Sequence, residues 1–330
     1  MGAAVCVAPT ALVKATIGGG RVIKFLLRRL LNATITLLMM SVVVFAVARL
    51  SGDPVGQLLP VDATPEQIQR VREAWGFDGP LHEQYFSFLS NALRGDFGES
   101  LRWRGQNAMH LVLTRISASL ELAGVALLFS LVVSVPLGVL SAARRGTPLD
   151  GFAKGIALFG QSIPHFWLAL MFMWIFGVLL RWLPTSGRGT VWHLIMPAVV
   201  IGWFHTSAMM RLLRSAMLEA LESEYIKLAR IKGVREWLVI WKHALRNAVA
   251  VPLTYFGIML GRLLVGSIAI ETVFSWPGAG RLIVDAIRAR DFPVVQAAVL
   301  VFAAAFIVTN LLVDILYGYI DPRIRIEKRA

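Results

Sequence analysis

The side chains that could carry chemistry in this chain are few, and none has the spacing of a catalytic or metal site. The 330 residues include one cysteine, Cys6, and six histidines scattered along the chain. One cysteine cannot form an internal disulfide, and the histidines lack the spacing of zinc ligands. The sequence contains no GxxxxGK[ST] phosphate loop, no HExxH and no GxSxG pattern. We therefore expect no metal site, no ATP-binding loop and no catalytic residue.

A basic stretch from Met217 to Asn247 is the main candidate for an interaction site. With Arg211 and Arg214 just before it, the stretch carries eight of the 33 lysines and arginines. Apolar residues recur at helical steps over 218–229, and Gly233 ends that pattern as a helix C-cap glycine would. A second amphipathic run follows, with Trp237, Ile240, Trp241, Ala244 and Leu245. Two short helices joined at a glycine predict a rigid protrusion that a partner could hold; a loop that only sets topology is the alternative.

The composition indicates a protein that crosses a membrane several times. It is 57% hydrophobic and 16% charged, with a positive mean hydropathy, which lies outside the range of soluble domains. A net charge of +13 would suggest a nucleic-acid partner for a soluble chain. Here the charges stand at the ends of apolar segments, so we interpret them as topology signals and expect no nucleic acid to bind.

Six apolar segments are long enough to cross a membrane, which takes roughly 20 helical residues for a ~30 Å hydrocarbon core. They lie at about 30–48, 118–140, 156–180, 194–210, 248–270 and 294–317. The third is interrupted by SIPHFW (162–167), where Pro164 should kink it, because proline removes a backbone donor.

The remaining residues divide into segments outside the spans. Residues 1–29 and 318–330 are the terminal segments, and 49–116 form a polar insert after the first span, which is followed by a five-helix core over 117–317 that includes the loop 211–247. Within the insert, Thr64 and Gln67 form a capping-box pair, which predicts a helix from there to about Gly76. A second helix is predicted over 81–94 and closed by Gly95.

The distribution of lysine and arginine orients these spans. With both termini in the cytoplasm, the inner segments carry 20 of these residues and the outer segments 12. Seven of the outer ones belong to the long first loop, which translocates largely regardless of charge. The basic stretch is therefore predicted to be cytoplasmic.

Four residues of the fifth span raise separate questions. Gly257 and Gly261 form a GxxxG pair, with Gly266 further on, and such residues let helices pack closely or line a path. Arg262 is a charge within the span, which is costly unless it is paired or faces water. It could face a central cavity, snorkel, or pair with Glu121 or Glu271; the sequence leaves these open.

Several longer motifs together resemble one family, the permease subunits of ATP-binding cassette (ABC) importers, in the dipeptide, oligopeptide and nickel branch. The resemblance covers about residues 21–325. It is carried by SGDPV (51–55), GPLHEQYFSFLSNALRGDFGESL (79–101), EYIKLARIKG (224–233), HALRNA (243–248), ETVFSWPGAGRLIVDAIRARDFPVVQ (271–296) and NLLVDILYGYIDPRIR (310–325).

This resemblance implies an all-α, polytopic membrane protein with six transmembrane helices of type I ABC importer permease architecture, a helical external insert and a cytoplasmic coupling helix. It implies the bacterial inner membrane, a second related permease, one or two ATPase subunits that bind the ATP, an external substrate-binding protein that docks near the insert, and surrounding lipid. The coupling residues would be Glu224, Tyr225, Ala229, Lys232 and Gly233.

The cargo implied by the resemblance is a dipeptide or oligopeptide, with nickel chelates, glutathione, opines or sugars as alternatives. Two other classes of function are an ion-coupled secondary transporter and an intramembrane enzyme. The first expects paired acidic residues or interrupted helices in repeated halves. Glu121 and Asp314 lie near the ends of their spans and make no such pair at the membrane midplane.

Overall fold

The computed structural model describes residues 19–51, 64–67, 69 and 79–320, without the side chains of 19–26, 258, 260–266 and 314–320. Every regular element in this part of the chain is a helix, and one isolated β-bridge joins Glu99 to Asn107. The elements are α1 (Gly19–Leu50), α4 (Leu81–Leu93), α5 (Ala108–Ala143), α6 (Pro148–Ser162), α7 (His165–Phe172), the π-helical η1 (Met173–Leu179), α8 (Val191–Glu222), α9 (Glu224–Ile231), α10 (Glu236–Leu238), the π-helical η2 (Val239–Ala244), α11 (Leu245–Ala248), α12 (Ala250–Gly266), α13 (Ile268–Val273), α14 (Ala279–Arg288) and α15 (Phe292–Ile320).

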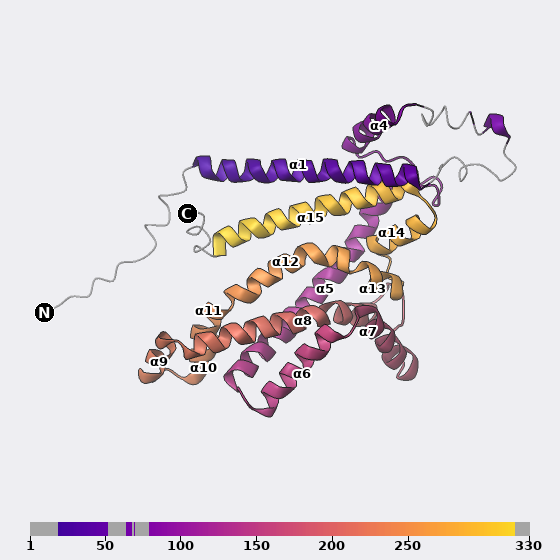
Figure 1. The fold of residues 1–330 in the computed structure, drawn as a ribbon. Helices are drawn as coiled ribbons and strands as arrows, with labels where there is room; N and C mark the ends of the chain where they lie inside the picture. Colours follow the sequence, from indigo (N-terminus) through magenta and orange to yellow (C-terminus); the bar gives the residue numbers. More distant parts are fainter. Residues whose placement is uncertain (1–18, 52–63, 68, 70–78, 321–330) are drawn as a thin grey trace.

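The long helices form a bundle with two distinct ends (Figure 1). The short helices α9 and α10 project at one end, and the beginning of α1 and the end of α15 lie toward the same end. The helices α4, α13 and α14 lie at the opposite end. The basic stretch and the external insert are thus separated by the length of the bundle.

Among the described residues, four helices are long and apolar enough to span a membrane: Leu27–Leu50, α5, α8 and Phe292–Val313. The bent pair of α6 with α7 and η1 makes a fifth if it is one span. Helix α12, where the remaining span was predicted, has 17 residues. The chain is therefore an all-α, multi-pass membrane protein, although fewer than six helices meet the length and composition of a simple span.

The interruption predicted at 162–167 is confirmed, but it is a complete break of the helix rather than a kink. Helix α6 begins at Pro148 and ends at Ser162, and α7 starts anew at His165, with a bend of 108° between the two parts. Ile163 is extended, at φ −92° and ψ 126°, as steric contact with a following proline ring requires. Because Pro164 also lacks an N–H, the helix breaks completely.

Two other helices are longer than the spans predicted for them. Helix α5 starts at Ala108, ten residues before the predicted span, because the side chain of Asn107 caps it by accepting from the His110 N–H at 3.2 Å. The predicted division at 116 therefore falls inside a helix. Helix α8 continues past the predicted end at residue 210 to Glu222, so the start of the basic stretch is a direct extension of the span.

The structure bears out the local signals of the insert. The Thr64 N–H donates to Gln67 Oε1 at 3.0 Å and the Gln67 N–H donates to Thr64 Oγ1 at 3.4 Å, which is the predicted capping box. The predicted end of that helix near Gly76 lies outside the described residues. Helix α4 matches its prediction, and Gly95 follows it at φ +77°.

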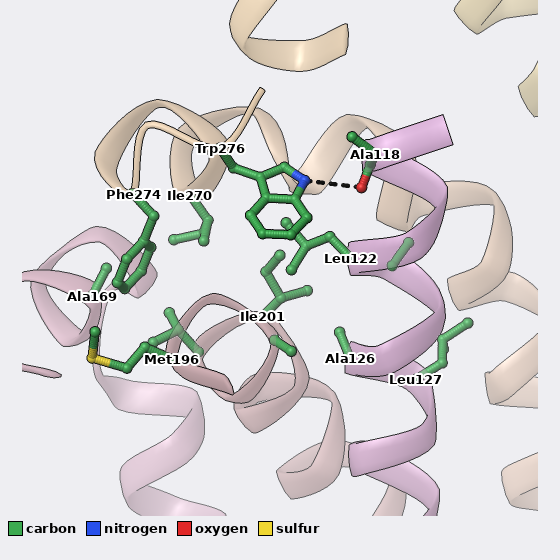
Figure 2. Close-up of a cluster of buried hydrophobic side chains, with 13 residues drawn as sticks. Ala118, Leu122, Ala126, Leu127, Ala169, Met196, Ile201, Ile270, Phe274 and Trp276 are labelled. Carbon is green, nitrogen blue, oxygen red and sulfur yellow. Dashed lines mark hydrogen bonds between the residues drawn. The ribbon is translucent and has the colours of Figure 1, made fainter. Parts of the chain in front are cut away.

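A cluster of buried side chains around Trp276 joins the helices at the α13–α14 end (Figure 2). The Trp276 indole is fully buried among residues of α5, α7 and α8, and its Nε1–H donates to the Ala118 carbonyl at 2.9 Å. Trp276 thereby fixes the turn before α14 against α5.

A buried carboxylate supports the same turn. Glu271 accepts from Ser119 Oγ at 2.7 Å, from Ser267 Oγ at 2.9 Å and from the Arg281 N–H at 3.0 Å. A Cβ at Gly278 would lie 2.3 Å from Glu271 Oε2, so only glycine fits there. Glu271 is one of the two carboxylates that the sequence analysis names as possible partners of Arg262.

Candidate functional site

Helix α9 is the element of the basic stretch that stands out from the bundle. Ser223 separates it from α8, because its extended backbone, φ −70° and ψ 153°, interrupts the helix. The Ile226 side chain, fully buried, then anchors α9 to the chain. We call the buried residues around it the loop-base cluster: Val139, Ala142, Leu213, Met217, Ala220, Ile226, Val239, Ala244 and Ala248.

The outer face of α9 is apolar and uncovered in this chain. Tyr225 is 41% exposed, Leu228 52% and Ile231 82%. Exposed apolar side chains grouped on one small helix indicate a surface that another molecule covers. The predicted apolar period therefore divides at Ser223: Leu218 and Leu221 pack inward on α8, whereas Tyr225 and Leu228 face outward on α9.

The predicted glycine cap of this helix is confirmed. Gly233 has φ +76° and follows Lys232, the C-cap residue of α9. Its N–H donates to the Arg230 carbonyl at 3.0 Å, and the Val234 N–H donates to the Ala229 carbonyl at 3.2 Å. These two bonds make a Schellman motif. A Cβ at Gly233 would meet no atom within 4 Å, so the requirement for glycine comes from the backbone alone.

Two ion pairs lie on the surface of α9 and at its junction with α10. Arg230 donates to Glu236 from Nη2 at 2.7 Å and from Nε at 3.2 Å, which ties the end of α9 to the start of α10. The Glu236 carboxylate raises the pKa of Arg230, which favours the charged guanidinium. Glu224 accepts from Lys227 at 2.7 Å, and both are exposed. Exposed pairs of this kind contribute little to stability, so Glu224 remains available to a partner.

The second half of the basic stretch departs from its predicted α-helical form. Residues 239–244 wind as a π-helix, in which bonds join residues five apart. Val239 and Ala244, five residues apart, are both buried in the loop-base cluster. The sequence pattern named Ala244 but missed Val239, because it assumed α-helical spacing. The rings of Trp237 and Trp241 pack at 5.2 Å between centroids.

A buried ion pair fixes α8, the helix that precedes α9. Asp150 is fully buried at the start of α6 and accepts from Arg214 Nε at 2.8 Å and Nη2 at 3.1 Å. It also accepts from Ser141 Oγ of α5 at 2.7 Å and from the Gly146 N–H at 3.1 Å. One carboxylate thus joins α5, α6 and α8. Sequence inspection missed Asp150, whose only signal is its place in the first turn of a helix that begins with proline.

The predicted coupling residues are close together in the structure, but they differ in exposure. Glu224, Tyr225, Lys232 and Gly233 are exposed, whereas Ala229 is partly buried against the loop-base cluster. Ala229 therefore packs in part on its own chain. Their role in coupling stays a prediction.

The residues predicted for packing or for a path are only partly described. Gly257 is buried on α12, which lies against α8 and α15. Gly261, Arg262 and Gly266 belong to the part of α12 whose side-chain surroundings the structure does not describe. Glu121, one partner suggested for Arg262, forms an ion pair with Arg188.

Pro164 marks the break between α6 and α7, where the chain turns toward α8. The His165 ring lies 5.0 Å from the Phe204 ring of α8. His205, the residue after Phe204, has a buried Nδ1 with no hydrogen-bond partner. These residues bring polar groups to the break between α6 and α7.

Comparison with known proteins gives matches along nearly the whole chain. A family model described as a binding-protein-dependent transport system inner membrane component matches residues 134–326, and a model of the N-terminal part of such components matches residues 22–101. The chain is 38% identical over 330 residues to the dipeptide transport system permease protein DppB of Alkalihalophilus pseudofirmus, covering 91% of this chain and 99% of the relative.

Other relatives carry different printed substrates. The chain is 38% identical over 304 residues to the glutathione transport system permease protein GsiC of Escherichia coli strain K12, covering 92% and 99% of the two chains. A putative peptide permease protein of Brucella suis is 37% identical, with the same coverage. One solved structure, an amino acid ABC transporter with histidines, matches at a TM-score of 0.47 and 14% identity over 64% of this chain and 94% of that chain. We draw no conclusion from that weaker match.

Replacing Gly233 tests the backbone argument. An L-residue at this positive φ costs about 1 kcal/mol, or about fivefold in local opening, and asparagine costs less because it tolerates the left-handed region. We expect Gly233→Ala to speed amide hydrogen exchange at Val234 about fivefold, and Gly233→Asn to speed it less. Lys232→Ala, an exposed neighbour without a special φ, is the control. Equal exchange in the alanine variant and the wild-type chain would show that the cap does not hold α9.

Proposed function

This chain belongs to the family of binding-protein-dependent transport system inner membrane components, and we propose that its α9 face is where ATPase subunits drive it. The chain is a multi-pass permease subunit of an ABC importer. The observation that supports the proposal is the exposed apolar set Tyr225, Leu228 and Ile231 on a short helix that the chain itself holds rigidly. Such a surface suits insertion into a groove of a partner.

The mechanism we propose is mechanical. When the ATPase subunits close on ATP, they displace α9, and the buried Ile226 passes that displacement to the loop-base cluster. Helix α8 has 32 residues, about 48 Å at 1.5 Å per residue, so its movement reaches from the protrusion into the span. Because Asp150 ties α8 to α5 and α6, these helices would move together as one packed unit.

We propose that ATP is bound and hydrolysed by the partner subunits and that this chain supplies no catalytic residue. It would form the translocation path with a second related permease, above one or two ATPase subunits. In this arrangement Glu224 and Lys232 would make polar contacts at the edge of the apolar face. The absence of a GxxxxGK[ST] loop from the sequence supports this division of labour.

We propose that both termini are cytoplasmic and that the insert faces outward, where an external binding protein would dock. The distribution of lysine and arginine supports this orientation. So does the bundle, in which the start of α1 and the end of α15 lie toward the same end as α9, with α4 at the opposite end (Figure 1).

The proposed cargo is a peptide-class molecule, because relatives of nearly full coverage are named for dipeptides, peptides and glutathione. Specificity would lie largely in the binding protein. The ligand that copurifies with the binding protein of this system tests the proposal: a short peptide or glutathione would agree with it. A nickel chelate, an opine or a sugar would contradict it.

A charge at the centre of the α9 face should remove the ATPase. In Leu228→Glu, the carboxylate would have to be buried in an apolar groove, which costs more than 1.4 kcal/mol and therefore weakens binding at least tenfold. We expect at least a tenfold loss of copurifying ATPase, measured against this chain in detergent extracts, with the amount of membrane-inserted chain unchanged.

The control is Leu93→Glu, at an exposed leucine at the end of α4, where the side chain is 82% exposed against 52% for Leu228. It should leave the copurifying ATPase unchanged, because that end of the bundle would face outward. The comparison therefore also tests orientation. Loss of the ATPase with Leu93→Glu but not with Leu228→Glu would refute both the docking face and the orientation.

A further inference from the structure

A cavity of about 290 Å³ lies between α6 and α8, separate from the α9 face. Its polar lining is formed by Ser141, Lys154, Gln161, Arg211 and Arg214. Three of these five side chains are cations, contributed by two helices. Of these three cations, the proposed coupling mechanism uses only Arg214, as the partner of Asp150.

The charges around this cavity do not balance. Asp150 is already shared between Arg214 and Lys154, whose Nζ lies 2.8 Å from Oδ2. Arg211 donates to the neutral amide oxygen of Gln161 at 2.8 Å. Among the described residues at this cavity, three cations therefore face one carboxylate. The excess positive charge attracts an anion, and the guanidinium of Arg211 is well shaped for phosphate oxygens.

The rest of the lining is apolar. Ala153, Ala157, Leu158 and Met210 complete the wall, and Leu158 is 70% exposed next to the cations. A wall of this kind offers nothing to a free inorganic anion, but it would pack against the glycerol and the first carbons of a lipid chain. The combination of a cationic head and an apolar flank fits an amphipathic anion.

The position of the cavity along the bundle agrees with such a ligand. Lys154 lies in the second turn of α6, which begins shortly after α5 ends, and Arg211 lies on α8 two residues before Leu213 of the loop-base cluster. That cluster also contains Val139 and Ala142 at the end of α5, so the cavity lies toward the end of the bundle that carries α9. In the proposed orientation, this is the level of the headgroups of the inner leaflet. Basic pockets between spans on the cytoplasmic side are suited to anionic headgroups.

We propose that this cavity binds the phosphate of an anionic phospholipid from the inner leaflet. Lys154 and Arg211 hold the phosphate, and the acyl chain leaves along Leu158. The volume is near the lower end for ligand pockets, so it accommodates a headgroup phosphate rather than a complete nucleotide. Because the cavity adjoins the Asp150 ion pair, a bound headgroup would hold α6 against α8. The inference rests on the proposed orientation but not on the α9 docking face.

The test is photocrosslinking in the assembled transporter, purified with its partner subunits and placed in phosphatidylcholine nanodiscs. Photoactivatable phosphatidylglycerol or phosphatidylcholine is added, and labelled peptides are mapped. We expect phosphatidylglycerol to label peptides that contain Leu158 or Met210 more strongly than phosphatidylcholine does. The double variant Lys154→Gln/Arg211→Gln should reduce this labelling about tenfold, since each cation near a headgroup contributes to attraction. The charge-retaining variant Lys154→Arg/Arg211→Lys should keep most of it.

The matched control is Arg144→Gln/Arg145→Gln, which removes two exposed cations at the end of α5, outside the cavity. It should change the labelling less than twofold if attraction is local rather than a general surface effect. Equal labelling by the two lipids, or equal loss in both double variants, would overturn the proposal.

A separate arm distinguishes the source of the phosphate. If inorganic phosphate, compared with chloride at equal ionic strength, raises the melting temperature of the complex through Lys154 and Arg211 while no lipid labels the site, the lipid assignment is wrong. ATPase copurification is measured on the same samples. Its retention in the Lys154→Gln/Arg211→Gln variant separates failure of this site from failure of the docking proposal.

Discussion

The stability of α9 depends on tertiary contacts, because an eight-residue helix is too short to persist alone in water. Two features hold it. Buried Ile226 fixes one face on the loop-base cluster, and the Schellman motif at Gly233 satisfies the carbonyls at its end. With its inner face fixed, the helix must present Tyr225, Leu228 and Ile231 outward. The exposed apolar face is thus produced by the anchoring of the helix rather than by its own helix propensity.

The same anchoring makes α9 a part of the bundle instead of a loop that moves independently. Ile226 shares its cluster with Leu213 and Met217, which belong to the long helix α8. At the next residue of α8, charge replaces packing: Arg214 pairs with Asp150, and this pair connects α8 to α5 and α6. Replacing such a buried pair by apolar groups is often neutral for stability, so its value here lies in setting one register between three helices. A force on α9 would therefore be transmitted through α8 to the helices packed against it.

Local signals in the sequence predicted the elements whose form is decided locally. The glycine at 233, the capping box at Thr64 and the extent of α4 follow from backbone geometry and nearest-neighbour hydrogen bonds, and they could be read without the fold. Hydropathy likewise located the four long apolar helices found among the described residues, since their length is fixed by the bilayer.

Features decided by distant contacts could not be predicted in this way. The π-helix that buries Val239 and the role of Asp150 depend on residues far away in the sequence. The breaks at Ser223 and Pro164 were underestimated for a different reason. The helical period of apolar residues continues across Ser223 and the hydropathy continues across Pro164, and a proline or serine in such a run can produce either a kink or a complete break. The packing of neighbouring helices decides between the two.

Crosslinking from a single position tests the central claim most directly. With Cys6 replaced by serine, a cysteine in place of Ile231 would be the sole thiol of the chain, at the most exposed apolar position of α9. A short thiol-to-amine crosslinker applied to the assembled transporter should join this chain to an ATPase subunit. A cysteine in place of Leu93 should give no such product. If position 231 crosslinks only to an external binding protein, or if position 93 captures the ATPase, α9 is not the face through which ATP hydrolysis drives this permease.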